Sequence, residues 1–444
     1  MFTAMIVYLL LVLIRPQDYP QLIDSIGLPL QPIALLIAAG FWMLSPRKNF
    51  EAPQYPIMLV FLFVLMVSHV FNGWAGGAIK QFEKFAPVVL AFVVFANGID
   101  RRERVLKMMA LFSVCAAVLS LHGIEQKQTG LGWTGMELSQ GTRIQYVGIF
   151  NDPNDLGLLF VACVPMAVYL SSRVSGLKRL FWRIVAGILV YGVYLTDSRG
   201  SLLGMLATMG IYIWQTRGVV VAGVLGLMGA GALLALPSRF SEIDVEEASA
   251  QGRVDSWYEG LQMFREHPIL GVGPDMYSDY HHLTAHNSFV LILAETGIIG
   301  FTLWLAFVIY CFRMMWAASR EHLVHEDWPE DLEAAAADGD AEAAAEIEEF
   351  AAQQEVIEEG RKISLTLLLS LAGFFICAFF LSRSYVVILY LLAALVVAHY
   401  TNMRQYAPQL PEFSLSQEAI IWPIVGVGGA IGLYVVVKIL LVMQ

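Results

Sequence analysis

Charged side chains are scarce in this 444-residue sequence: only 15% of its residues are charged, whereas 57% are hydrophobic. Soluble domains carry about a quarter charged residues, so the composition excludes an ordinary soluble domain. Cysteine is scarce too. All four cysteines fall inside apolar runs, too far apart for a disulfide framework or a zinc signature: Cys115, Cys163, Cys311 and Cys377. The chain therefore belongs in a bilayer.

A cleavable leader is not evident, because the first apolar run leads into Arg15-Pro16 without a small-residue cleavage site. We expect this run to remain as a short first span. Nearly every apolar run reaches the roughly 17 to 25 residues that a helix needs to cross a bilayer. The sequence thus predicts an all-α, polytopic protein with 12 or 13 transmembrane helices in a single domain, residues 1–444. The spans lie near 3–14, 30–44, 55–71, 85–97, 105–123, 153–170, 181–196, 200–215, 218–236, 287–312, 363–381, 384–400 and 418–441.

Basic residues are missing from residues 321–360, which hold 15 Asp and Glu and no Lys or Arg. Because the whole chain carries −11, the remainder carries +4. The acidity is local, and no nucleic-acid partner is expected. Sixteen of the 27 Lys and Arg fall in inner loops if the N-terminus is cytoplasmic, the orientation that the positive-inside rule favours. Two outer, periplasmic loops are then long, 124–152 and 237–286, and an acidic helical insertion, 313–362, lies inside.

Two arginines are candidates for binding an anion. Asp197-Ser198-Arg199-Gly200 is a turn between two apolar runs, which puts a guanidinium beside the N-terminus of the next helix. Arginine matches phosphate oxygens bidentately, and a helix N-terminus adds free N–H groups and a positive dipole end. Arg253 in the long outer loop would supply a second cation. The alternative is a tight turn in which Arg199 pairs with Asp197 or with lipid headgroups.

His286 is the candidate base, because it stands at the membrane boundary and histidine accepts protons near neutral pH. A metal site from His282 and His286, four residues apart, is a weaker alternative without the intervening carboxylate of a zincin helix. We therefore expect neither a metal nor another cofactor. Glu295 lies more than two helical turns further on, inside the membrane, so we expect it to pack or to orient its neighbours.

The first outer loop ends in a further group of polar residues. Asn151 or Asp152 is placed to cap the following helix, with glycan contact as the alternative. Arg143 and Asn287 join them as possible supporting residues. Gly271 and Gly273 are too close together for a nucleotide-binding fingerprint and no strand precedes them, so we interpret them as structural.

The ordered set of motifs resembles the O-antigen ligase and polymerase family of bacterial membrane glycosyltransferases over residues 140–305. The motifs are Asn151-Asp152-Pro153-Asn154, Asp197-Ser198-Arg199-Gly200, Gly252-Arg253, His267-Pro268 with Gly271-Val272-Gly273, and His286-Asn287-Ser288 with Glu295-Thr296-Gly297. The resemblance implies about 12 helices, similar to the membrane-embedded, lipid-donor (GT-C-like) glycosyltransferases, and periplasmic, metal-independent activity. It also implies a donor glycan on undecaprenyl pyrophosphate, held by Arg199 and Arg253, while His286 activates the acceptor.

The acceptor stays open: lipid A-core, a growing polysaccharide chain or a protein hydroxyl all fit the same motifs. Attack opposite the leaving pyrophosphate predicts inversion at the anomeric carbon. A transporter or flippase of lipid-linked saccharides is the main alternative of another class, although its polar groups should be spread through the membrane. A scaffold for polysaccharide export is a third. The oligomeric state is not predicted.

Overall fold

The fold is almost entirely helical. The computed structural model describes residues 1–22, 27–46, 48–234, 243–320 and 340–442. In these ranges there is no β-strand, only two isolated bridges, Leu131 with Glu137 and Ser139 with Arg143. Residues 237–242 of the expected outer loop and 321–339 of the expected insertion lie outside the described residues.

Each of the 13 predicted spans coincides with a helix. They are α1 (Phe2–Leu13), α2 (Leu30–Met43), α3 (Gln54–Phe71), α4 (Ala75–Gly98), α5 (Arg102–Thr129), α6 (Pro153–Ser172), α7 (Gly176–Leu195), α8 (Arg199–Arg217), α9 (Val219–Leu234), α12 (Ser288–Ala318), α14 (Ala341–Ala378), α15 (Val387–Arg404) and α16 (Ile421–Val442). Seven of the described helices, α3, α5, α6, α12, α14, α15 and α16, are long and apolar enough to cross a membrane. The others are shorter or less apolar. The prediction of an all-α, multi-pass membrane protein is confirmed.

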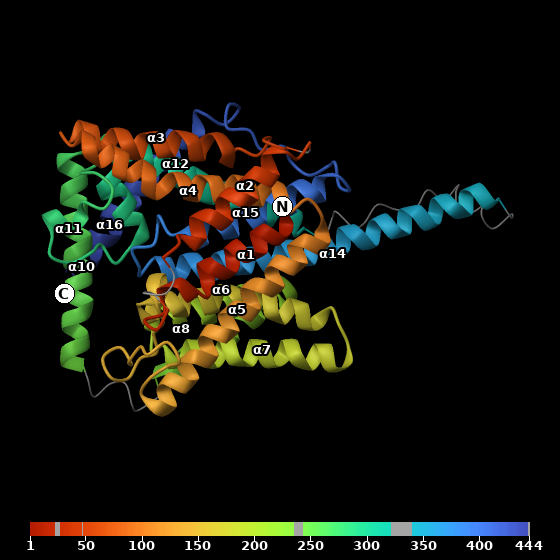
Figure 1. Cartoon of the computed structure of the whole chain (residues 1–444), viewed down its shortest axis with the longest axis horizontal. Helices are drawn as coiled ribbons and strands as arrows, with labels where there is room; N and C mark the ends of the chain where they lie inside the picture. The colour runs from red at the N-terminus through yellow and green to blue at the C-terminus, as the bar shows by residue number, and fades with distance from the viewer. Residues whose placement is uncertain (23–26, 47, 235–242, 321–339, 443–444) are drawn as a thin grey trace.

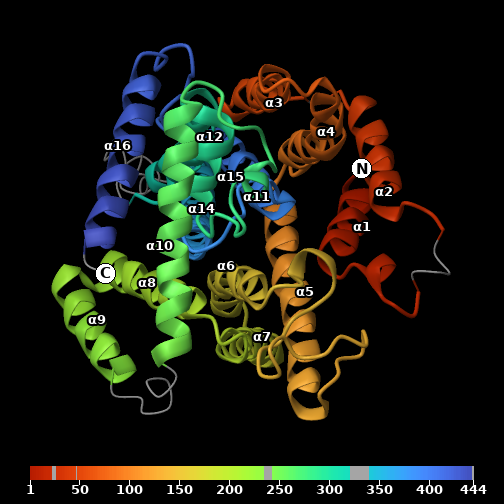
Figure 2. The ribbon, with the colours of Figure 1, turned by 90° about the vertical axis from the view of Figure 1, so that its left-hand side faces the viewer.

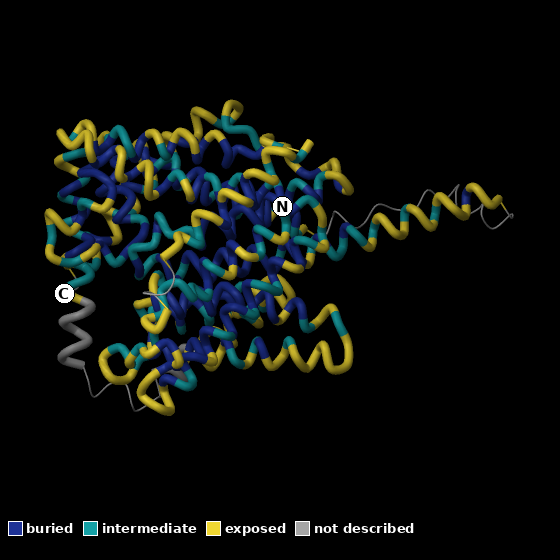
Figure 3. The backbone as a smooth tube through the Cα atoms, viewed as in Figure 1, coloured by how far each residue is buried: buried dark blue, intermediate teal, exposed yellow. Residues whose placement is uncertain are grey.

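The two ends of the bundle differ. Many of the helices run roughly side by side, and α10 (Ile243–Glu266) crosses one end of them (Figure 1). Seen from that end, α10 passes in front of α12 and α14, with the short α11 (Tyr277–Tyr280) beside it (Figure 2). The N-terminal half of α14 projects from the opposite end, where most of its residues are exposed (Figure 3).

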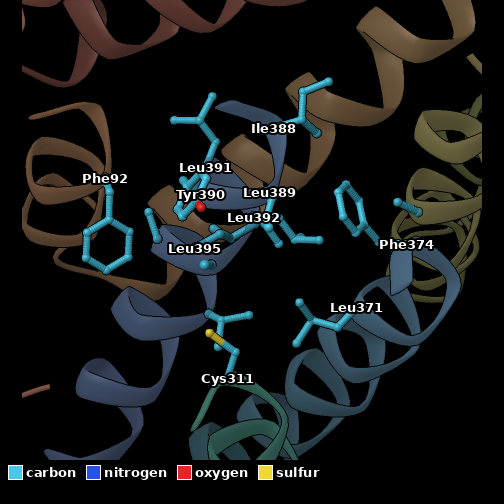
Figure 4. Close-up of a cluster of buried hydrophobic side chains, with 14 of the residues drawn as sticks. Phe92, Cys311, Leu371, Phe374, Ile388, Leu389, Tyr390, Leu391, Leu392 and Leu395 are labelled. Atoms are coloured by element: carbon cyan, nitrogen blue, oxygen red, sulfur yellow. The ribbon is translucent and has the colours of Figure 1, made fainter. Parts of the chain in front are cut away.

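The core is centred on α15, which is apolar on every face over most of its length and is therefore surrounded by other helices. Its residues Leu389, Tyr390 and Leu392 are at most 2% exposed. Figure 4 shows them beside Phe92 of α4, together with side chains of α12 and α14. The four cysteines are all buried and free within helices, as predicted.

Ion pairs of basic residues lie at the end where α14 projects. Glu359 of α14 pairs with Arg102 at the start of α5 (2.6 Å) and with Arg173 at the end of α6. Arg313 near the end of α12 forms a bidentate pair with Glu418 (2.6 and 2.8 Å). The last turns of the acidic segment are therefore anchored at the end of the bundle opposite α10.

Candidate active site at the α10 end of the bundle

The turn before α8 has the predicted form. Ser198 is the N-cap of α8 and accepts a hydrogen bond from the Ser201 N–H (3.2 Å), so Arg199 is the first helical residue. Asp197 has a left-handed backbone, φ 49°, which lets the chain reverse sharply between α7 and α8. The Arg199 side chain is exposed at this helix N-terminus, where an anion is favoured.

Arg253 brings a second guanidinium to the same place from α10. Burial lowers its pKa, and the nearby cations Arg143 and Arg199 lower it further, whereas Asp152 acts in the opposite direction. Residues separated by more than 100 positions in the sequence thus form one cationic cluster. Like charges that lie close together repel, so the cluster favours an anionic ligand.

Arg143 fixes the connection between α5 and α6 to the cluster. Its Nε donates to the Thr196 carbonyl (3.0 Å) and its Nη2 to Asn154 Oδ1 (2.9 Å). Asp152 is the N-cap of α6, as predicted, and its Oδ1 accepts from both the backbone N–H and the side-chain amide of Asn154, each at 2.8 Å. Arg143 therefore holds together the end of α7 and the start of α6.

His286 lies at the edge of this cluster, immediately before α12. It is half-buried, and burial lowers its pKa, an effect that Arg253 and Arg383 strengthen and Asp152 opposes. Its φ is +46°, an uncommon conformation for a histidine that the surrounding structure must enforce. The next residue, Asn287, caps α12 by accepting from the N–H groups of Phe289 (2.9 Å) and Val290 (3.1 Å). The cap and the backbone conformation fix the backbone at His286 beside the start of α12.

The other histidines of this loop are placed differently. His282 is exposed and its ring packs against His281, 4.4 Å between centroids. His281 itself lies 3.3 Å from the Ser256 hydroxyl of α10. Within the described ranges, no three His, Cys, Asp or Glu side chains gather in a metal-binding arrangement.

The glycine motifs pair with each other through their backbones. Val272 N–H donates to Ala294 O (3.0 Å) and Gly273 N–H to Glu295 O (2.9 Å), across a kink in α12 where Gly297 has φ +60°. A Cβ on Gly271 would lie 2.2 Å from the Glu295 carbonyl carbon, so any side chain there would clash. The structural interpretation of these glycines is confirmed.

Glu295 is buried at the same kink, 1% exposed, and one of its carboxylate oxygens accepts from the Tyr277 N–H (3.3 Å). Tyr277 in turn donates to the Ser256 carbonyl of α10. Glu295 is thus connected to α10 through α11.

An ion pair that the sequence interpretation missed lies beside His286. Arg383, in the connection between α14 and α15, pairs bidentately with Asp155 in the first turn of α6; the second contact, Nη2 to Oδ2, measures 2.5 Å. The Asp155 side chain is only 6% exposed. Both residues could have been noted in the sequence, because a charged residue beside an apolar span is a functional candidate. The sequence does not indicate which of the many such residues form a pair.

An open apolar groove of about 440 Å³ lies between α8, α12 and α14. Its walls come from α8, α12 and the end of α14, and include Leu203, Phe289, Phe312, Phe375, Phe379 and Phe380. At one end a Cβ on Gly200 would contact Phe380 at 3.4 Å, and Phe379 packs edge-on against Trp257 of α10, 5.5 Å between centroids. Arg199 precedes Gly200, and Arg253 lies one turn before Trp257. The groove therefore lies beside the helix turns that carry the two arginines.

The fold is that of a multi-pass membrane protein, and the cluster and groove form a candidate site for an anionic, partly apolar ligand at one end of its helical bundle. Residues 184–305 match the O-antigen ligase family model. The chain is 24% identical over 336 residues to an O-antigen ligase from Pseudomonas aeruginosa, covering 67% of this chain and 80% of that protein. It is 25% identical over 176 residues to an O-antigen polymerase from Salmonella muenchen, covering 35% of this chain and 44% of that protein.

These matches confirm the resemblance found in the sequence: the chain is similar to members of the O-antigen ligase and polymerase family. The match with the polymerase spans less than half of that protein's length. The family segment, residues 184–305, includes Arg199, Arg253 and His286, while Arg143, Asp155 and Arg383 lie outside it.

Proposed function

We propose that this protein transfers a glycan from undecaprenyl pyrophosphate to an acceptor hydroxyl. The observation that carries the proposal is that the apolar groove lies next to the cationic cluster. A pyrophosphate needs cations, and a polyprenyl chain needs an apolar surface that opens to lipid. A donor with both parts fits where Arg199 and Arg253 meet the phenylalanines of α12 and α14.

The proposed reaction is a direct displacement. The acceptor hydroxyl oxygen forms a bond to the anomeric carbon, and the bond from that carbon to the pyrophosphate oxygen breaks. His286 accepts the hydroxyl proton, and the two arginines stabilise the negative charge on the departing pyrophosphate. Because attack occurs opposite the leaving group, the configuration inverts. Two cations supply the charge that a metal ion would otherwise supply, so we propose that the reaction is metal-independent.

We place the site on the periplasmic side of the inner membrane, with the N-terminus in the cytoplasm. The support is the charge distribution: the basic inner connections gather with Glu359 at the end opposite the site, and positive loops favour the cytoplasm. The acceptor is lipid A-core or a growing polysaccharide chain, since the relatives are named as an O-antigen ligase and an O-antigen polymerase. A protein hydroxyl is the remaining alternative.

The experiment uses the purified full chain in nanodiscs with an undecaprenyl-pyrophosphate glycan. Lipid A-core, a serine-rich peptide or no acceptor is added in parallel, with and without EDTA. A glycosylated core would identify a ligase, a glycosylated peptide a protein transferase, and chain growth with donor alone a polymerase. No covalent product in any arm, together with movement of the donor across the membrane of sealed vesicles that contain the same purified chain, would overturn the proposal in favour of a flippase. Activity lost in EDTA and restored by zinc would overturn metal independence.

The acidic insertion should be dispensable for the reaction. We expect deletion of residues 325–358 to leave the transfer rate unchanged, because Glu359 keeps its pairs with Arg102 and Arg173 and the site lies at the other end of the bundle. The rate per folded protein, measured in nanodiscs, checks this. A deletion variant that elutes as a monodisperse peak with a normal unfolding temperature but transfers nothing would make the insertion a functional part.

A further inference from the structure

We infer that Arg383, through its ion pair with Asp155, is a positioning residue that sets the alignment of His286 against the pyrophosphate-binding arginines. The inference rests on the proposed function. Neither residue is among those proposed to contact the reacting atoms, and neither lies in a motif that pointed to the family.

The first step is the attachment of Arg383 to the start of α12. The Arg383 N–H donates to Ser288 Oγ (2.9 Å), and that hydroxyl donates to the Leu381 carbonyl (2.6 Å). Ser384 Oγ donates to the Ser288 carbonyl (2.7 Å). Ser288 is two residues after His286, and its side chain is 1% exposed. The connection that carries Arg383 is thus fastened to the helix end that presents His286.

The second step is the attachment of the same arginine to α6. The bidentate pair fixes the guanidinium plane against Asp155, which is three residues after the N-cap Asp152. Asp152 and Asn154 in turn hold Arg143, which reaches the end of α7 at Thr196. One chain of hydrogen bonds therefore runs from the start of α12 through Arg383 and the start of α6 to the turn that precedes Arg199.

This chain joins the two halves of the proposed site. His286 comes from the start of α12, and Arg199 follows directly on α7, so their separation depends on how α6 is held between them. His286 also has φ +46°, a conformation that its own sequence does not favour and that the neighbouring contacts must maintain. A loss of alignment of about 1 Å between reacting groups can cost a hundredfold in rate.

Arg383 has a second effect on His286, through charge. The charged groups that act on the imidazole are Arg253 from α10, Asp152 from the start of α6 and Arg383 itself. The two arginines lower the pKa of His286 and Asp152 raises it. Removing the Arg383 charge should therefore raise the pKa of the base and move the acid limb of the pH–rate profile to higher pH.

The test compares Arg383→Lys, Arg383→Gln and Asp155→Asn with the wild type in nanodiscs. The lysine variant keeps the charge but loses the bidentate geometry. We expect its kcat to fall at least about tenfold, with KM for the donor and the acid limb unchanged. The glutamine variant should show the same fall in kcat together with an acid limb displaced to higher pH. Asp155→Asn should reduce kcat without weakening binding of undecaprenyl pyrophosphate.

Arg313→Lys is the matched control, because Arg313 also forms a bidentate pair, with Glu418, but at the opposite end of the bundle. It should leave kcat and the pH profile unchanged.

If the Arg383 variants fold and keep the wild-type kcat and pH profile while His286→Ala is inactive, the positioning role is wrong and the proposed function stands. If the wild type itself forms no product, the proposed function has failed. A fall in the unfolding temperature of the Arg383 variants, with normal kcat per folded molecule, assigns the pair to stability alone and overturns the inference.

Discussion

Replacing His286 with alanine should reduce glycan transfer about 10²- to 10⁴-fold, the usual contribution of a positioned general base. The reason is that no other titratable group described in the loop before α12 combines partial burial with a place beside Arg253 and Asp152. Donor binding should persist, because the arginines remain. The measurement is the initial rate of transfer at saturating donor, together with the dissociation constant for undecaprenyl pyrophosphate.

The pH dependence follows from the same assignment. Burial, Arg253 and Arg383 lower the pKa of His286 below its ordinary value of 6.5. A base acts in its neutral form, so the rate should rise with pH through this lowered pKa and then level off. His282→Ala is the matched control: it removes an exposed imidazole four residues earlier and should leave rate and profile unchanged. Equal losses of transfer rate in His282→Ala and His286→Ala would contradict the assignment of a single base and would favour a metal site formed by the two histidines.

The helices could be predicted from the sequence, but the contacts between helices mostly could not. Apolar runs mark helices directly, because each buries its own backbone hydrogen bonds and needs only length and hydrophobicity to cross a bilayer. The capping role of Asp152 and the place of Arg199 at a helix start were also local properties, and both are found in the structure. Local chemistry of this kind can be predicted from a few consecutive residues.

The pair between Asp155 and Arg383 could not be predicted in this way. The two residues are separated by 228 positions, and only the packing of α6 and α14 brings them together. The apolar groove beside Arg199 has the same origin, since its walls come from three helices. Within the sequence each phenylalanine is an ordinary membrane residue, and the groove forms only where α8, α12 and the end of α14 come together.

Arg253→Ala and Arg199→Ala should each weaken binding of undecaprenyl pyrophosphate by roughly ten- to a hundredfold, the range for losing a hydrogen bond to a charged group. Arg253 is partly buried among other cations, a costly arrangement that an anionic ligand relieves. Lysine at either position should restore part of the affinity, since it keeps the charge but not the planar fork.

The binding measurement separates this role from that of the base. Titration of the lipid pyrophosphate into nanodiscs gives the dissociation constant, and undecaprenol, which lacks the phosphates, should bind wild type and both variants equally through the apolar groove. Arg265→Ala is the matched control, because Arg265 is an exposed arginine in the last turn of the same helix as Arg253. In the double variant the two losses should not simply add if both guanidinium groups contact the same pyrophosphate. Unchanged affinity in both single variants, or an equal loss for Arg265→Ala, would show that the pyrophosphate does not bind to this cluster. There would then be no reason to place the departing group opposite His286.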